Sequence, residues 1–187
     1  MKKLFFCSSL LAIILSCSDP VELKTYSIKG YIGLDQQVQN IEPLTIRLYQ
    51  NDLLIATSNS PEFEFKALKE GENYTIIPES NEASYNGLSS LDLTLENNYI
   101  AGTDSFTPFQ FVAADMNKDG IVDATDKDLL FNCVVNNIGC SGHRFVTPDY
   151  TPQGVGHADQ IIFEHLNADQ QVQFFGIKIG DVSGVTH

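Results

Sequence analysis

The sequence predicts an α+β multidomain protein, in which an antiparallel β-sandwich precedes an all-α region and a short extended segment. Three observations support this prediction. Short segments of alternating apolar and polar residues recur between residues 24 and 78, as expected for half-buried strands. An acidic stretch of twelve residues, 115–126, leads into an apolar pattern with helical spacing. An apolar run at 171–182 has the character of a strand that ends in a turn.

The N-terminus has the features of an export signal. Lys2 and Lys3 precede an apolar stretch, Leu4–Leu15, that is too short to span a bilayer by itself. The stretch ends in Ile14-Leu15-Ser16-Cys17, which resembles the lipobox of bacterial lipoproteins. The resemblance implies removal of residues 1–16, lipidation of Cys17 and anchoring in the outer membrane or at the cell surface, with residues 17–23 as a tether. The alternative is an ordinary signal peptide with a nearby cysteine.

The chain is strongly acidic, with 11 basic against 24 acidic residues and a formal net charge of −13 at pH 7. This charge disfavours nucleic acids and anionic lipids as partners and favours cations. Cys133 and Cys140 remain beyond the lipobox. Export to an oxidising compartment predicts a disulfide between them, because the neighbouring sequence offers no further ligands in a zinc-binding spacing.

Residues 24–78 are expected to form the sandwich. The predicted strands are Thr25–Ile32, Leu44–Tyr49, Leu53–Thr57, Glu62–Lys66 and Tyr74–Ile77. The order of the segments YSIKGYI, PLTIRLY and FEFKALKEGENYTIIP resembles the carboxypeptidase-regulatory-like β-sandwich, which has a prealbumin- or immunoglobulin-like fold. This stretch contains no histidine and no cysteine, so we interpret it as a structural spacer.

The twelve residues 115–126 have the spacing of an EF-hand calcium loop. A hard divalent cation takes six or more oxygen ligands from alternate positions of such a loop. The side chains at positions 1, 3, 5, 9 and 12 are Asp115, Asn117, Asp119, Asp123 and Asp126. Ile121 at position 7 would add its carbonyl oxygen, and Gly120 at position 6 permits positive φ. The alternative is a solvated acidic turn before a helix.

A weaker repeat precedes this loop. If Asp92 is aligned with Asp126 at position 12, the first loop begins at Asn81, and its positions 3 and 5 are Ala83 and Tyr85. These two residues offer no carboxylate or amide oxygen. The first loop is therefore expected either to bind a cation weakly through Asn81, Asp92 and carbonyl groups, or to hold no metal. Apolar residues at helical spacing predict one helix after each loop.

The loop, the segment DLTLENNYIAG, a linker and a second loop–helix together resemble a dockerin module over residues 79–138. The chain is similar to dockerin proteins of Bacteroidetes, in which segments like YNGLSSLDLTL and FFGIKIGDVSG recur around the module. The resemblance implies two Ca²⁺-binding repeats of the F-hand kind, with aspartate at position 12, and a partner such as a cohesin. In dockerins, positions 10 and 11 begin the partner-facing surface; here they are Ser90-Leu91 and Ala124-Thr125.

Residues 139–187 form a C-terminal extension. Its apolar run at 171–182 is expected to pack back on the helices or on the sandwich, so that residues 79–187 form one unit. Asp181 is a candidate capping residue or a neighbour of metal ligands. The scattered histidines, including His143, fit no metal-ligand spacing and are expected in solvated loops.

These features predict a non-catalytic, calcium-binding surface lipoprotein whose dockerin-like module docks another protein. The partner would be cohesin-like or another surface protein, with a possible link to polysaccharide catabolism. The alternative is a purely structural module, whose calcium-stabilised helices pack on its own sandwich without a partner. An enzyme is disfavoured, because the chain has no room for a catalytic domain beside the two modules and its scattered acids form no paired-carboxylate site.

Overall fold

The computed structural model describes residues 23–34, 41–80, 86–152, 154, 156 and 158–184. The proposed signal peptide, Cys17, most of the tether and Asn81 lie outside these residues. Within the described part, no helix is long and apolar enough to cross a membrane.

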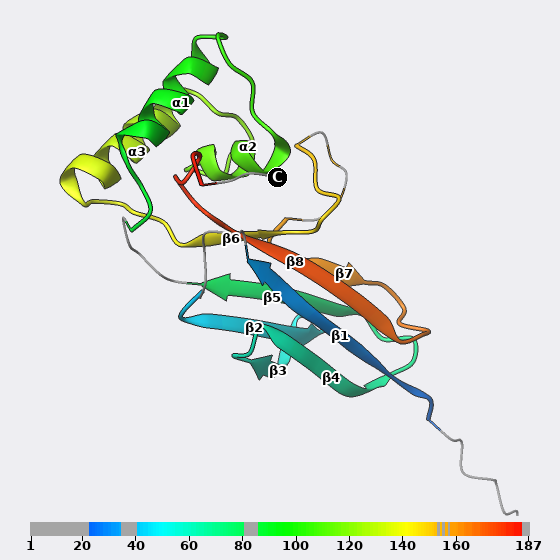
Figure 1. The fold of residues 1–187 in the computed structure, drawn as a ribbon. Coiled ribbons are helices and arrows are strands. Elements are labelled where there is room, and N and C mark those ends of the chain that lie inside the picture. Colours follow the sequence, from blue (N-terminus) through cyan, green and yellow to red (C-terminus); the bar gives the residue numbers. More distant parts are fainter. Residues whose placement is uncertain are drawn as a thin grey trace, which may run out of the picture.

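Eight strands form two four-stranded sheets that face each other (Figure 1). The first sheet has the order β4-β1-β8-β6, and the second has the order β3-β2-β5-β7. The strands are β1 Thr25–Leu34, β2 Leu44–Gln50, β3 Leu53–Ser58, β4 Glu62–Lys69, β5 Tyr74–Ser80, β6 His143–Val146, β7 Ile161–Phe163 and β8 Gln170–Lys178. Together with the helices described below, this arrangement confirms the predicted α+β multidomain class.

The sequence suggested a sandwich confined to residues 24–78, but the sandwich extends beyond this range. Strands β6, β7 and β8, which come after the helices, occupy places in both sheets. The predicted antiparallel pattern holds for every pair except one, because β8 lies parallel to β1. Gly30 allows this close approach, since a Cβ atom there would collide with the carbonyl group of Val172. The local periodicity of a strand does not show which distant strand it pairs with. For this reason the sequence did not predict that β6, β7 and β8 belong to the sandwich.

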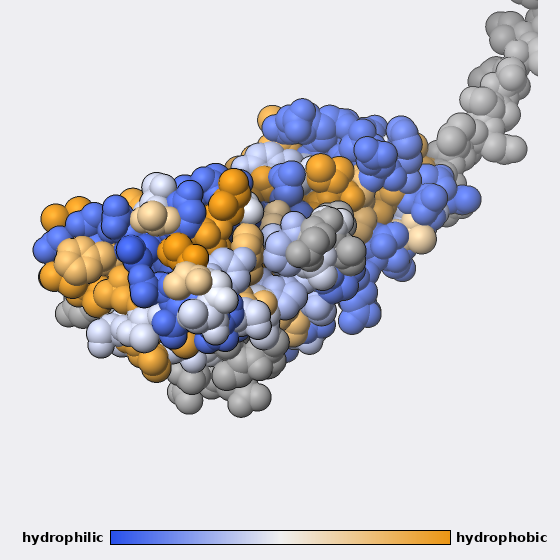
Figure 2. Space-filling view, turned by 90° about the horizontal axis from the view of Figure 1, so that it is seen from above, coloured by the Kyte–Doolittle hydropathy of each residue, from blue (hydrophilic) through white to orange (hydrophobic). Residues whose placement is uncertain are grey.

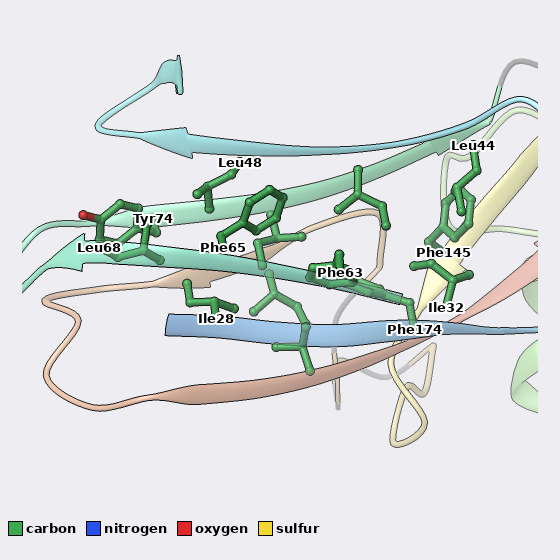
Figure 3. Packing of buried hydrophobic residues seen from close by; sticks show 14 of the residues in the cluster. Ile28, Ile32, Leu44, Leu48, Phe63, Phe65, Leu68, Tyr74, Phe145 and Phe174 are labelled. Carbon is green, nitrogen blue, oxygen red and sulfur yellow. The ribbon is translucent and has the colours of Figure 1, made fainter. Parts of the chain in front are cut away.

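The inward faces of the two sheets form the main hydrophobic core (Figure 3). Strands β2 and β5 alternate between buried and half-buried residues, and this is the pattern that predicts strands with one face in a core. Ile28, Leu48, Tyr74 and Phe174 are among the buried side chains. β8 contributes Phe174 to this core, so the segment after the helices is an integral part of the sandwich.

Three helices lie together at one end of the sandwich (Figure 1). They are α1 Ser90–Ile100, α2 Pro108–Ala114 and α3 Ala124–Asn136. Each begins with a capping box, whose N-cap residues are Ser89, Thr107 and Asp123. The helices predicted after the two loops are α1 and α3, whereas the short α2 was missed because seven residues carry little periodic signal.

The helices are joined to the sandwich through a second and a third apolar cluster. Val146 at the end of β6 and Ile177 in β8 pack with Val112 of α2. Beyond β8, Ile179 packs with Leu130 of α3. The tail therefore packs on the helices and also forms part of the sandwich.

Candidate functional site

The predicted calcium loop connects α2 to α3, and both helix ends help to shape it. Asp115 is the C-cap residue of α2, and Asp123 is the N-cap residue of α3. Asp126 lies in the first turn of α3. Helices thus fix positions 1, 9 and 12 of the loop, while the residues between them form its exposed turn.

The side chain of Asp115 organises the turn. Its Oδ1 atom accepts a hydrogen bond from the Asp119 N–H at 3.0 Å, and its Oδ2 atom accepts one from the Gly120 N–H at 3.1 Å. Gly120 has φ +83°, as predicted for position 6, where a side chain would be strained. The carboxylate at position 1 thereby fixes the backbone course of positions 5 and 6.

Two further side chains bond the backbone within the turn. The Asn117 Oδ1 atom accepts from the Asp119 N–H at 2.8 Å, and the Asp119 Oδ1 atom accepts from the Ile121 N–H at 2.9 Å. Both side chains are exposed. Carboxylate and amide oxygens have further lone pairs available for a cation, so these bonds and metal coordination are compatible.

Asp126 closes the loop from the inside. It is fully buried, and its two oxygens accept from the Asn117 N–H at 3.1 Å and the Asp123 N–H at 3.0 Å. These bonds connect position 12 with positions 3 and 9. Val122 at position 8 is buried, whereas Ile121 at position 7 is exposed.

Arg144 of β6 is a site residue that the sequence analysis did not identify. Its Nη1 atom lies 3.2 Å from Oδ2 of Asp115, and its Nε atom lies 3.1 Å from Oδ2 of Asp159. Arg144 and Asp115 are both buried. Burial raises the pKa of Asp115, while its hydrogen bond from Gly120 and the positive charge of Arg144 oppose that rise. A link between residues 29 apart on different elements gives no local sequence signal.

Buried negative charge around the loop suits a cation. Asp92, Glu96, Asp115 and Asp126 are all buried, and among the described residues only Asp115 of these four has an ion pair. The Glu96 carboxylate has no hydrogen-bond partner. Burial raises its pKa to about 8, and the negative charge of Asp126 adds to the rise. With this pKa the Glu96 carboxyl group is protonated near pH 7 and adds no negative charge. The fit to Ca²⁺ therefore rests on the aspartate oxygens of the loop, because buried carboxylates without a cation are costly.

The side chains of the loop are not arranged around a common point where a metal ion could bind. Across the described ranges, no group of three or more His, Cys, Asp or Glu side chains is close enough to hold a metal ion. The loop carboxylates are instead turned toward the backbone N–H groups described above. The fit to calcium therefore rests on the oxygen-rich donor set and on the buried charge.

The remaining predicted site residues are in different surroundings. Asp92 is buried at the start of α1, where its Oδ2 atom accepts hydrogen bonds from the backbone and hydroxyl groups of Ser89 at 2.7 and 2.9 Å. Cys133 and Cys140 form a disulfide with sulfur atoms 2.07 Å apart. His143, expected in a solvated loop, is buried in β6.

A comparison with known families finds the dockerin type I domain at residues 87–134. This range covers α1, α2, the loop 115–126 and most of α3. Searches among curated proteins and among solved structures found no match. Dockerin domains are non-catalytic, typically bind Ca²⁺ and typically dock to cohesins. The similarity of residues 87–134 to this domain implies calcium-binding protein docking, and no catalytic domain was found.

Proposed function

We propose that this chain is a non-catalytic, calcium-dependent docking protein that is held at the cell surface by a lipid on Cys17. The observation that supports it most directly is the loop 115–126 within the dockerin domain, with its oxygen donors at positions 1, 3, 5, 9 and 12 and its buried negative charge. In this proposal Ca²⁺ is held by the predicted ligands, namely Asp115, Asn117, Asp119, Ile121 through its carbonyl group, Asp123 and Asp126. The ion neutralises the loop and holds the start of α3 in place.

The docking surface that we propose lies on α1 and α3. Leu91, Phe131 and Val135 on these helices, and Ile138 just beyond α3, are large apolar side chains that are about half exposed or more. A groove of about 350 Å³ is lined by residues of both helices, among them Thr94, Lys127 and Phe131. Figure 2 shows hydrophobic side chains among polar ones at the helical end of the molecule. Apolar anchors with a polar rim are typical of protein interfaces.

The sandwich would act as a spacer that carries this surface away from the membrane. A cohesin-like surface protein is the partner that the dockerin domain favours. A role beside polysaccharide-degrading proteins would be consistent with such a partner, and the lipobox-like segment supports anchoring in the outer membrane.

A purely structural role is the second candidate, and one observation favours it. Arg144 of the sandwich already pairs with the first loop ligand, Asp115, in a buried position. Calcium could then serve only to stabilise packing between the helices and their own sandwich, with no partner bound.

A capture experiment from the native cell surface distinguishes these two functions. The full chain is immobilised with Ca²⁺ or with EDTA, and bound proteins are identified. Docking predicts a partner that is retained with Ca²⁺, released by EDTA and lost in Phe131→Glu. The matched control is Leu54→Glu, which changes an exposed leucine on β3 of the sandwich and should leave capture intact. Capture that neither EDTA nor Phe131→Glu reduces would contradict the proposed docking surface.

A further inference from the structure

The turn that follows β8, residues 180–184, lies against the beginning of α1. The Ser183 N–H donates a hydrogen bond of 2.7 Å to Oδ1 of Asp92, across a sequence separation of 91 residues. Asp92 is fully buried and is the position-12 aspartate of the first loop. A segment far along the chain thus satisfies one oxygen of the residue that should close that loop.

The same pair of hydrogen bonds occurs at the intact loop. Asp126 accepts through Oδ2 from the N–H at position 9, Asp123, and through Oδ1 from the N–H at position 3, Asn117. Asp92 likewise accepts through Oδ2 from the N–H at its position 9, Ser89. The Oδ1 atom of Asp92 accepts a hydrogen bond from the Ser183 N–H. Ser183 therefore corresponds to position 3 of the intact loop.

The sequence around Ser183 supports this correspondence. The intact loop is entered through Ala114-Asp115-Met116-Asn117, and the turn after β8 reads Gly180-Asp181-Val182-Ser183. Each segment has a small residue, an aspartate, an apolar residue and a polar residue in that order. The aspartates are both buried, and so are Met116 and Val182. Each aspartate also accepts a hydrogen bond from a later N–H, which for Asp181 is that of Gly184 at 2.8 Å.

The turn is closely fitted between the helices. A Cβ atom at Gly180 would lie 2.7 Å from the side chain of Leu88 and 2.9 Å from that of Leu130. The Gly180 N–H donates to the Ala113 carbonyl oxygen at 2.7 Å. Position 180 therefore touches the first loop, α2 and α3 at once, and it has no room for a larger residue.

We propose that residues 180–184 are the entering half of the first repeat, so that the first loop is assembled from two distant segments of the chain. Asp181 takes position 1 and Ser183 takes position 3, in place of Asn81 and Ala83 in the contiguous alignment. The dockerin match begins only at Gly87, which agrees with a repeat whose first half lies elsewhere. This assignment concerns the internal construction of the domain and holds whether or not a partner docks.

Hydrogen exchange of the full chain tests the assignment. Ser183→Pro removes the N–H donor and should speed exchange of the α1 amides at Thr94–Asn97 at least tenfold, while the α3 amides at Leu129–Asn132 change less than threefold. Ser183→Ala keeps the N–H group and is the matched control, for which no change is expected. Equal acceleration in α1 and α3, or no change in α1, would overturn the proposal.

A second variant approaches the same bond from the other side, in case Ser183→Pro does not fold. Asp92→Ala removes the acceptor, and exchange of the amides at Val182–Gly184 should accelerate at least tenfold. The α3 amides again serve as the internal reference. Unchanged exchange at Val182–Gly184 would show that the turn is held independently of the first loop, and the proposal would then be abandoned.

Discussion

At the scale of single residues, the candidate ligands of the loop include two buried carboxylates and three exposed side chains, and all five accept hydrogen bonds from backbone N–H groups. Asp115 and Asp126 are buried and bind loop N–H groups, whereas Asn117, Asp119 and Asp123 are exposed. Removing a buried member would disturb the fold and calcium binding together. An exposed member is the better probe of calcium, because the hydrogen bond that it makes to the backbone is itself exposed.

Asp119→Ala is therefore expected to weaken calcium binding at least tenfold, or about 1.4 kcal/mol, because one anionic ligand is lost. Isothermal titration calorimetry on the full chain measures the change. Asp128→Ala is the matched control, since Asp128 is an exposed acid of α3 outside the loop. If both variants bound calcium equally well, position 5 would not be a ligand.

A second residue-scale prediction concerns His143, which is buried and has no hydrogen-bond partner for either ring nitrogen. Burial, with a smaller contribution from Lys178, lowers its pKa to about 4 from 6.5. The unfolded chain therefore binds a proton below about pH 6.5, whereas the folded chain does so only below about pH 4. Stability supplied by the neutral ring is complete above pH 6.5 and declines as the pH falls toward 4.

His143→Gln, which cannot titrate, should remove this component. Between pH 7 and pH 5 the wild type is expected to lose about 2 kcal/mol more unfolding free energy than the variant. Urea unfolding at the two pH values measures the difference, with His165→Gln as the control at an exposed histidine. Parallel pH profiles for wild type and His143→Gln would contradict the burial argument.

At the scale of elements, α3 depends on bonds at both ends. Its start is held by the capping box of Asp123 and Asp126. Its last turn carries Cys133, which is bonded to Cys140 seven residues further on. Between the two cysteines, Asn137 adopts a left-handed conformation with φ +53°, which ends the helix.

Replacing both cysteines by alanine should lower the unfolding free energy by about 2–3 kcal/mol, the chain-entropy value for a short loop. Urea unfolding of the variant and of the wild type, each with and without reductant, gives the comparison. Reductant should bring the wild type down to the variant and leave the variant unchanged. If reductant did not change the unfolding free energy of the wild type, the disulfide would add no stability.

The elements also show which parts of the fold could be predicted from the sequence. Strands β2 and β5 were predictable, because their apolar residues repeat at the period of the structure that they form. Helix α1 was also expected from the spacing of apolar residues, but its buried side chains are those of Asp92 and Glu96, whereas Leu91 is exposed. The loop ligands stay a prediction, which rests on the oxygen-bearing side chains that calcium requires at fixed positions. The turn after residue 179 was also expected. The pairing of Arg144 with Asp115 and the bond from Ser183 to Asp92 were not predictable, since each joins distant segments and leaves no local pattern.

At the scale of the whole molecule, the segment after α3 makes one body of the sandwich and the helices. β8 lies within the sheet beside β1, and the chain continues directly into the turn that contacts all three helices. Arg144 adds a bridge from β6 to the calcium loop. Opening of the helices should therefore expose sandwich core residues such as Phe174 indirectly, through the loss of β8.

This connection predicts that calcium stabilises strands that do not touch the loop. A ligand that binds only the folded state adds about 2.7 kcal/mol at a concentration of 100 Kd, which is about a hundredfold in an equilibrium constant. If α3 and the sandwich open as one unit, while α1 can also open locally, calcium should slow exchange of the β2 and β5 amides about as much as that of the α3 amides. Hydrogen exchange in Ca²⁺ and in EDTA measures the slowing in the two strands and in α3. In Asp119→Ala, calcium should no longer slow exchange in either region. Slowing in α3 with none in β2 and β5 would mean that the helices open alone, and that β8 and Arg144 do not couple the two parts.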